Sequence, residues 1–273
     1  ILGLADEYDA DSDGDLMHGG VVEGVRRLPE VGAADGAVAG SQTQRAAATL
    51  SVTTFNDIVN SGDGDLSLRE AINDAVDGDI ISLGAGTYLI ELDDGADITT
   101  TPSSDNGTNE NANASGDFDI NGKILTIQGA GKDVTFIDAQ ELDRVFHIYG
   151  GANVTLKDLT ITGGHINYSH GGGILIDGST TAAHLENVKI DGNTVQTEDA
   201  TNNDRHGGGM WVQNATVTGV NVDITNNTAT RNGAGRNSSG AGLWASSAAN
   251  VTLTDSNISN NTATHSAGGG VYA

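Results

Sequence analysis

The sequence predicts an all-β fold, a parallel β-solenoid, from two repeated phrases and from the lack of helical periodicity. One phrase is a glycine cluster that enters an apolar strand: GGGILI, GGGMWV, GAGLWA and GGGVYA, beginning at Gly171, Gly207, Gly240 and Gly268. The other is a strand and turn, marked by Ile161, Ile190, Ile224 and Ile258. Residues 117–273 show no apolar period of about 3.6 residues, which excludes helical repeats.

Repeats of this length determine how the chain buries its apolar side chains. A unit of roughly 30 residues cannot cover its own apolar face, so it needs a neighbour stacked on each side. Strands that alternate Ile, Val or Leu with Thr, Asp or Asn, joined by turns with Gly or Asn, are typical of solenoid coils. We therefore expect the four marker isoleucines to lie directly over one another in the interior.

The composition excludes several classes of protein. Glycine makes up 39 of 273 residues, but with only 2 Pro and no Cys the chain is neither a collagen-like repeat nor a disulfide scaffold. Lys and Arg number 12 against 37 Asp and Glu, and the net charge of −25 excludes nucleic acid as a partner. No apolar run approaches the roughly 18 residues of a membrane-spanning helix. The acidity suits a calcium-rich or salty exterior, although an ordinary solvated surface is its commoner cause.

Composition also divides the chain into three segments. Residues 1–30 contain an acidic cluster, and residues 31–49 are a linker of small residues without an apolar period. A β-rich pattern begins at Leu50, so residues 50–273 are predicted as the solenoid. Because the chain starts at Ile1 and stops at Ala273 inside a repeat phrase, we expect it to be an internal piece of a longer protein, with further coils beyond.

A short helix is predicted at residues 67–76, where the solenoid begins. Ser67 and Glu70 have the spacing of a capping box, in which each side chain bonds to the other's backbone N–H. Apolar residues then recur on one face, at Leu68, Ala71, Ile72, Ala75 and Val76. We expect this face to cover the end of the first coil.

The segment around this helix resembles a known family. Residues 65–72, DLSLREAI, are similar to the CSLREA motif, found where right-handed parallel β-helices of large surface or secreted bacterial proteins begin; Leu66 replaces the usual Cys. The Gly-Gly-Gly and Ile-x-Asn-Asn phrases are similar to repeats of polymorphic-outer-membrane-protein-like and pectate-lyase-like β-helices. The resemblance implies a right-handed parallel β-helix over residues 50–273, with a short N-terminal capping α-helix, on an exported protein.

A second resemblance lies near the start of the chain. Gly3, Asp6 and Met17 match the turn glycine, the third zinc-ligand position and the turn methionine of metzincin-type metallopeptidases, in the stretch that follows their HExxH motif. That motif supplies two zinc ligands and the general base, and it is missing here. Residues 1–30 thus resemble a partial metallopeptidase tail that cannot assemble a zinc site alone; an acidic surface loop is the alternative.

Alternating carboxylates in the same segment suggest a Ca²⁺ site. Asp9, Asp11, Asp13 and Asp15 have the spacing of an EF-hand-type loop, with glycine at its sixth position. The twelfth position, which needs a bidentate Glu, is Gly20. Ca²⁺ is therefore a candidate cofactor, and a solvated acidic turn is the alternative.

An aromatic column is predicted within the glycine phrases. Trp211, Trp244 and Tyr272 occupy the same place in successive phrases, so they should stack. Facing outward, they could bind sugar rings or a partner surface; facing inward, they would be core stacks. Three histidines stand ahead of the phrases, namely His170, His206 and His265. Stacked imidazoles could bind a metal, although exposed turn histidines are the commoner case.

These features predict a non-catalytic structural or adhesive segment of a large secreted or cell-surface protein. Contact with a surface polysaccharide, or with a protein of a host or neighbouring cell, is expected through loops at residues 93–116, 164–170 and 194–206. The alternative is a polysaccharide lyase or glycoside hydrolase of the pectate-lyase-like type. That enzyme would need a groove with convergent carboxylates beside Lys157 and Lys189, which we expect to align across the repeat.

Overall fold

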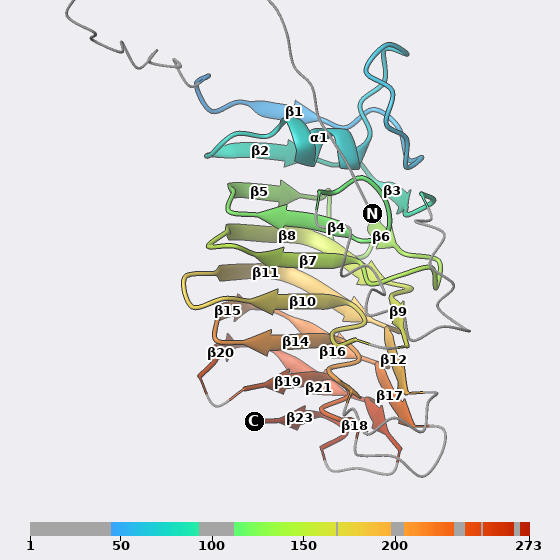
Figure 1. The fold of residues 1–273 in the computed structure, drawn as a ribbon, viewed down its shortest axis with the longest axis vertical. Coiled ribbons are helices and arrows are strands. Elements are labelled where there is room, and N and C mark those ends of the chain that lie inside the picture. The colour runs from blue at the N-terminus through green and yellow to red at the C-terminus, as the bar shows by residue number, and fades with distance from the viewer. Residues whose placement is uncertain are drawn as a thin grey trace, which may run out of the picture. The chain divides into compact units, whose positions relative to one another are not determined.

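Each strand pairs in parallel with the strands at the same position in neighbouring coils, which makes the fold a parallel β-solenoid (Figure 1). The computed structural model describes residues 45–92, 112–167, 169–197, 205–231, 238–246, 248–264 and 268–273. All of them belong to the second of two units, Ile1–Thr43 and Gln44–Ala273. The predicted fold class, an all-β parallel β-helix with one short helix, is confirmed for this described part.

The strands form three stacks and one short pair. The largest sheet runs in the order β1 (Thr49–Ser51), β2 (Asp79–Ser82), β5 (Ile124–Gln128), β8 (Asn153–Thr162), β11 (Ala182–Asp191), β15 (Thr216–Val220) and β20 (Asn250–Thr254). Beside this path lie β3 (Gly86–Leu89), β6 (Thr135–Asp138), β16 (Asp223–Thr225) and β21 (Asn257–Ser259). The second sheet is β4 (Phe118–Asn121), β7 (Phe146–Tyr149), β10 (Ile174–Asp177), β14 (Met210–Gln213), β19 (Leu243–Ala245) and β23 (Val271–Tyr272).

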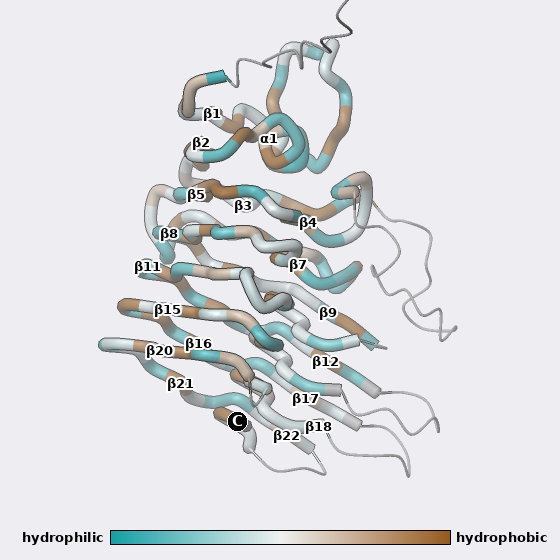
Figure 2. The backbone as a smooth tube through the Cα atoms, turned by 60° about the vertical axis from the view of Figure 1, so that its left-hand side comes forward, coloured by the Kyte–Doolittle hydropathy of each residue, from teal (hydrophilic) through white to brown (hydrophobic). Residues whose placement is uncertain are grey.

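The third sheet lies between these two along the path of each later coil. It contains β9 (His165–Ile166), β12 (Thr194–Thr197), β17 (Thr228–Arg231) and β22 (Thr262–Ala263), which lie one beneath another in Figure 2. The strands β13 (Arg205–His206) and β18 (Ser238–Ser239) form the remaining pair. One coil therefore passes through the three stacks in turn before the next coil begins.

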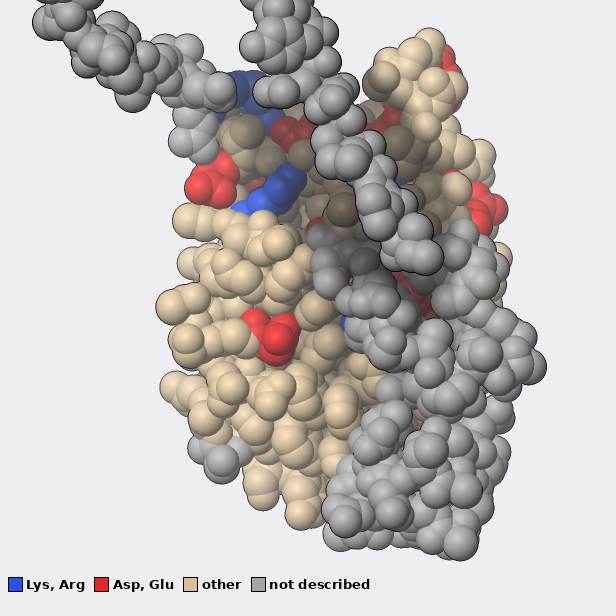
Figure 3. Space-filling view, viewed as in Figure 1, with Lys and Arg blue, Asp and Glu red and all other residues tan. Residues whose placement is uncertain are grey.

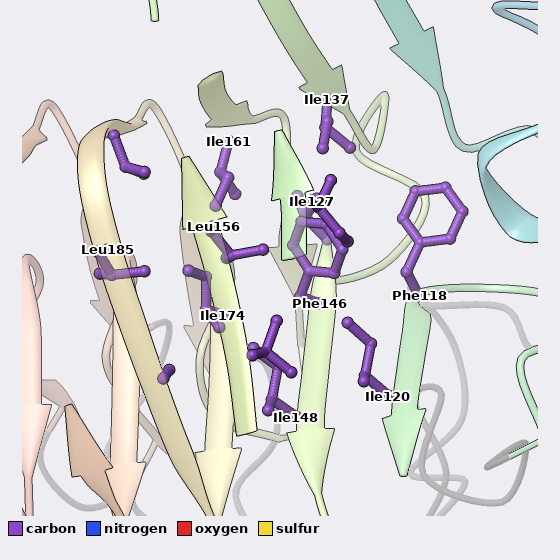
Figure 4. Packing of buried hydrophobic residues seen from close by; sticks show 14 of the residues in the cluster. Phe118, Ile120, Ile127, Ile137, Phe146, Ile148, Leu156, Ile161, Ile174 and Leu185 are labelled. Carbon is purple, nitrogen blue, oxygen red and sulfur yellow. The ribbon is translucent and has the colours of Figure 1, made fainter. Parts of the chain in front are cut away.

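The interior is filled by apolar side chains that repeat from coil to coil. The register pairs Ile161 with Ile190, Ile190 with Ile224, and Ile224 with Ile258. The first three are fully buried and Ile258 is half-buried. Figure 4 shows Ile161 on β8 among the inward-pointing side chains of the neighbouring coils and of the facing sheet. The predicted isoleucine column is therefore confirmed.

A second column consists of buried asparagines at the turn that leaves the first sheet. The side-chain oxygen of Asn227 accepts from the backbone N–H of Asn193 at 2.9 Å, and the oxygen of Asn261 accepts from the N–H of Asn227 at the same distance. The Nδ2 of Asn227 donates in turn to the carbonyl of Ile190 at 2.9 Å. Each amide thus satisfies backbone groups that the turn would otherwise leave buried and unpaired.

The glycine phrases are explained by this asparagine column. A Cβ on Gly209 would lie 2.7 Å from the carbonyl oxygen of Gly242 and 2.8 Å from Nδ2 of Asn227. Gly207 has a φ of +72°, which a residue with a side chain rarely adopts. The backbone of each coil therefore passes so close to the ladder, and turns so sharply before it, that glycine is required.

The helix α1 (Leu68–Asp74) covers the first coil, as the sequence predicts. Ser67 is its N-cap: the hydroxyl accepts from the N–H of Glu70, and the Glu70 carboxylate accepts from the N–H of Ser67 at 2.9 Å. Leu68, Ala71 and Ile72 are buried against the core, where the helix contacts β2 and β4. The helix ends at Asp74, two residues before the predicted boundary, because Ala75 adopts an extended conformation.

A buried arginine fastens the cap to the following coil. Arg69 is fully buried and forms a two-pronged ion pair with Asp57, with both nitrogen–oxygen distances 2.7 Å. Its remaining N–H groups donate to the backbone carbonyls of Ser115, Gly116 and Asp117. The arginine of the SLREA motif therefore joins the N-terminal loop to the chain segment that leads into β4.

The described structure begins before the first strand. Arg45 forms an ion pair with Asp79. The Oδ1 atom of Asp79 also accepts a hydrogen bond from the backbone N–H of Ala48 at 2.7 Å. Contacts of the solenoid therefore reach into the segment predicted as a linker, whereas residues 1–44 lie outside the described residues. No helix in the described part of the chain has the length and apolar character needed to cross a membrane.

Replacement of a ladder asparagine should destabilise the fold. Asn227→Ala leaves the N–H of Asn193 and the carbonyl of Ile190 buried without partners, so we expect a loss of about 3 kcal/mol in the free energy of unfolding. Urea denaturation followed by circular dichroism measures this loss. Asn250→Ala, at an exposed position, is the control and should change stability by less than about 0.5 kcal/mol. Equal effects in both variants would contradict the structural role of the ladder.

Loss of the buried arginine should have a similarly large effect. Arg69→Met leaves the Asp57 carboxylate buried and unneutralised, which we expect to cost roughly 3–5 kcal/mol. The double variant Asp57→Asn with Arg69→Met should recover part of the loss, because no charge then remains unpaired. Lys157→Met, which removes an exposed ion pair, should leave the denaturation midpoint nearly unchanged. A midpoint for Arg69→Met within error of the Lys157→Met value would refute this account of the cap.

Candidate functional site

The outer face of the second sheet carries one column of aligned side chains. The register places Trp211 beside Trp244 and Trp244 beside Tyr272, as the sequence predicts. Towards the N-terminus the same column continues through one residue in each coil: Leu175, His147 and Asp119. The column is thus aromatic at one end and polar at the other, and the polar end was not found from the sequence.

The aromatic end is a stack of parallel rings. The ring centres of Trp211 and Trp244 are 5.3 Å apart, with planes inclined by 9°. Trp211 points away from the inner core, which holds its neighbours Met210 and Val212. Trp211 is nevertheless only 7% exposed. This indole therefore faces outward from the solenoid and yet is largely covered, whereas Trp244 is half-buried.

Histidines from the preceding turns provide part of that cover. His170 stacks on Trp211 at 4.8 Å and 11°, and His206 stacks on Trp244 at 5.1 Å and 7°. The Nδ1 of His170 accepts from the backbone N–H of His206, and the Nδ1 of His206 accepts from that of Ser239. These imidazoles are therefore held as part of the ring stack, and His265 lies outside the described residues.

This stacking limits how the column could bind a sugar. A sugar ring needs a free aromatic face, and the faces of Trp211 and Trp244 are covered by each other and by the histidines. Tyr272, which ends the stack, is 44% exposed. Tyr272 nevertheless continues the ring stack, because its ring centre lies 6.5 Å from that of His206, with planes inclined by 4°.

The polar end holds a cluster of ionisable groups between two adjacent coils. Asp117 precedes β4, Asp119 lies on β4, and His147 lies on β7; potential ligand atoms of all three are within 4.8 Å of one another. Their exposed fractions are 0%, 4% and 8%. The cluster is therefore inaccessible to a polymer, whereas a small ion would fit its chemistry.

The imidazole of His147 is oriented by carboxylates on both sides. Its Nε2 lies 3.0 Å from Oδ1 of Asp177, on the next coil, and its Nδ1 lies 3.3 Å from Oδ1 of Asp119. The ring of Tyr149 stacks against it at 4.2 Å. Figure 3 shows one small acidic patch on a part of this face that otherwise carries no charged side chains.

Burial and charge set the electrostatics of the cluster. Burial raises the pKa of Asp117 well above its usual value; the negative charges of Asp143 and Asp119 add to this rise, and the charge of Arg144 opposes it. Arg144, itself fully buried, donates to Asp117 at 3.0 Å. Burial therefore disfavours the ionised form of Asp117, and Arg144 is the described cation that most opposes this effect.

The lysines expected at an enzyme groove are arranged differently from the prediction. The register pairs Lys157 with Glu186 and Lys189 with Thr160, so the predicted alignment of Lys157 with Lys189 is wrong. Lys157 forms an exposed ion pair with Glu186 at 2.9 Å, and Lys189 forms one with Asp191 at 3.0 Å. Both lie on the first sheet, whereas the carboxylate cluster begins on the second.

The candidate sites near the start of the chain lie outside the described residues. These are the Ca²⁺ positions Asp9, Asp11, Asp13 and Asp15 and the metallopeptidase-like positions Gly3, Asp6 and Met17. They therefore remain predictions.

The aromatic stack should contribute strongly to stability. Trp211→Ala removes a buried indole from between its neighbours, so we expect a loss of roughly 3–5 kcal/mol in the free energy of unfolding. Tyr272→Ala, at the exposed end of the same stack, should cost clearly less. Urea denaturation of both variants makes the comparison, and a larger loss in Tyr272→Ala would show that the indoles do not form a buried stack.

Comparison with known proteins gives no further assignment. The chain matches no family model, no curated protein and no solved structure. The parallel β-solenoid is established by the strand pairing itself.

Proposed function

We propose that the chain is a non-catalytic structural or adhesive β-helix segment of a large secreted or cell-surface protein. The observation that carries this proposal is the continuity of the columns. Isoleucine, asparagine and aromatic columns all run through successive coils in register. Such a stack is stiff and presents few open backbone segments to proteases, because the strands inside each sheet are paired on both sides.

The roles of the cap residues support an exported β-helix. Ser67 and Glu70 form the capping box, and Arg69 joins the first coil to the second. These are the central residues of the segment that resembles the CSLREA motif of surface and secreted β-helices. The net charge of −25 is compatible with an extracellular location, where it would keep such a rod soluble.

Adhesive contact would use positions that repeat along the stack. The described strands that flank the β12–β13 and β17–β18 connections pair in register, β12 with β17 and β13 with β18, so the strand ends repeat from coil to coil. The aromatic column, in which Tyr272 lies in register beside Trp244, is the other candidate contact. A surface polysaccharide or a protein of a host or neighbouring cell is the partner that we propose.

Binding and turnover should be measured together on the full 273-residue chain. We expect retention on immobilised neutral polysaccharides, weakened by Tyr272→Ala, with no release of reducing ends or unsaturated products. Gln213→Ala, an exposed position on the same sheet, is the matched control and should bind as the parent chain does. Turnover of pectin or alginate that Lys189→Ala abolishes would overturn the proposal in favour of the lyase or hydrolase.

A further inference from the structure

We propose that Asp117, Asp119 and His147 bind a divalent transition-metal ion, with Zn²⁺ the best fit, and that Asp177 positions the histidine for it. The site lies between the β4 and β7 coils, directly after the capped end of the solenoid. It is independent of the adhesive role proposed above.

The first argument is the orientation of His147. Its Nε2 is 3.0 Å from the Asp177 carboxylate, an acceptor, so Nε2 carries the proton. Metal-binding histidines usually donate their second ring N–H to a carboxylate in this way. The Nδ1 lone pair then points towards Oδ1 of Asp119, 3.3 Å away, and makes no hydrogen bond among the described residues.

With Nε2 protonated, Nδ1 of His147 and Oδ1 of Asp119 are two acceptors that face each other, and a positive charge between them would be favourable. Oδ1 of Asp117 also lacks a hydrogen-bond partner among the described residues, although the residue is fully buried. An unsatisfied buried carboxylate oxygen and an imidazole lone pair are both costly to desolvate. A metal ion bound to both would remove that cost for each.

The charge balance around the cluster favours a dication. The carboxylates near His147 and Asp117 belong to Asp117, Asp119, Asp143 and Asp177. The described cations nearby are Arg144, bonded to Asp117, and Arg69, whose strongest contacts are with Asp57. Among the described residues these carboxylates outnumber the two arginines, and a bound dication would offset part of their negative charge.

The donor set distinguishes among metals. Ca²⁺ and Mg²⁺ prefer oxygen ligands, with six to eight for Ca²⁺, whereas one imidazole with two carboxylates suits Zn²⁺. Zinc bonds of about 2.0–2.2 Å in a tetrahedron place neighbouring ligand atoms roughly 3.4 Å apart. The 3.3 Å between Nδ1 of His147 and Oδ1 of Asp119 matches this spacing, and the wider separations, up to 4.8 Å, would need to close slightly on binding.

A proton could also occupy the gap, which makes His147 an imidazolium held between Asp119 and Asp177. The two alternatives differ in what Nδ1 bonds. An imidazolium would carry protons on both ring nitrogens and would not respond to Zn²⁺, whereas a metal site would have Nδ1 unprotonated and ligated.

Calorimetric titration with Zn²⁺ tests the proposal. The full chain, stripped with EDTA and dialysed, should bind one Zn²⁺ that Ca²⁺ and Mg²⁺ do not displace, and Zn²⁺ should raise its melting temperature. Asp177→Asn, at a half-exposed position that should fold normally, should weaken binding by about 10- to 100-fold. His147→Gln should abolish it, and Co²⁺ should give visible absorption bands that this variant loses.

His184→Gln is the matched control, because His184 is a partly exposed histidine that contacts Thr218 on the first sheet. It should bind Zn²⁺ as tightly as the parent chain. The proposal is overturned if the parent chain gives no saturable Zn²⁺ binding, or if His147→Gln and Asp177→Asn bind Zn²⁺ unchanged. It is also overturned if ¹⁵N spectra show both His147 nitrogens protonated with and without Zn²⁺.

Discussion

The structure depends on the in-register parallel pairing of successive coils. This pairing places each residue about 4.8 Å from its counterpart, so a side chain must be compatible with a copy of itself. Apolar groups meet this condition by packing, as Ile190 does between Ile161 and Ile224. Asparagine meets it because its amide holds both a donor and an acceptor, whereas an ionised Asp at Asn227 would face backbone and side-chain acceptors with no donor of its own.

The outer column shows where that repetition ends. From Trp211 to Tyr272 the column is aromatic: the two indoles stack on each other and Tyr272 lies beside Trp244, and the result is a stack with a mainly structural role. Towards the N-terminus the column changes at each coil, through Leu175 and His147 to Asp119. Unlike side chains that meet across adjacent coils can combine donor, acceptor and charge, so chemistry is most readily built at this end.

Much of the fold follows from the sequence because the repeats are explicit in it. The isoleucine spacing gave the interior column, and the Ser67 and Glu70 spacing gave the cap. The same phrases, aligned on Ile161 and Ile190, already place Lys157 opposite Glu186. The register of the strands, and not the distance of each lysine from the following turn, therefore decides which residues lie opposite each other. The surroundings of the indoles could be predicted only in part. The alternation of inward and outward side chains along a strand indicates that the indoles face outward, but it does not indicate that His170 and His206 stack on them.

The carboxylate cluster could not be found in the same way. The coils of Asp119 and His147 lack the glycine phrase, and their register rests on two apolar pairs, Phe118 with Phe146 and Ile120 with Ile148. Asp117 lies before the strand, where its contact with Arg144 depends on the path of the preceding loop. Long-range placement of this kind is set by tertiary packing, which single-sequence patterns do not encode.

The asparagine ladder has a consequence for how such proteins change in length. Asn193 bonds to Asn227 in the same way that Asn227 bonds to Asn261, each 34 residues further on. If one such interval were deleted or duplicated, every ladder amide would still meet an identical partner. The chain can therefore lengthen or shorten in whole turns by genetic duplication or loss, and its reach from one end to the other becomes a heritable variable separate from its chemistry.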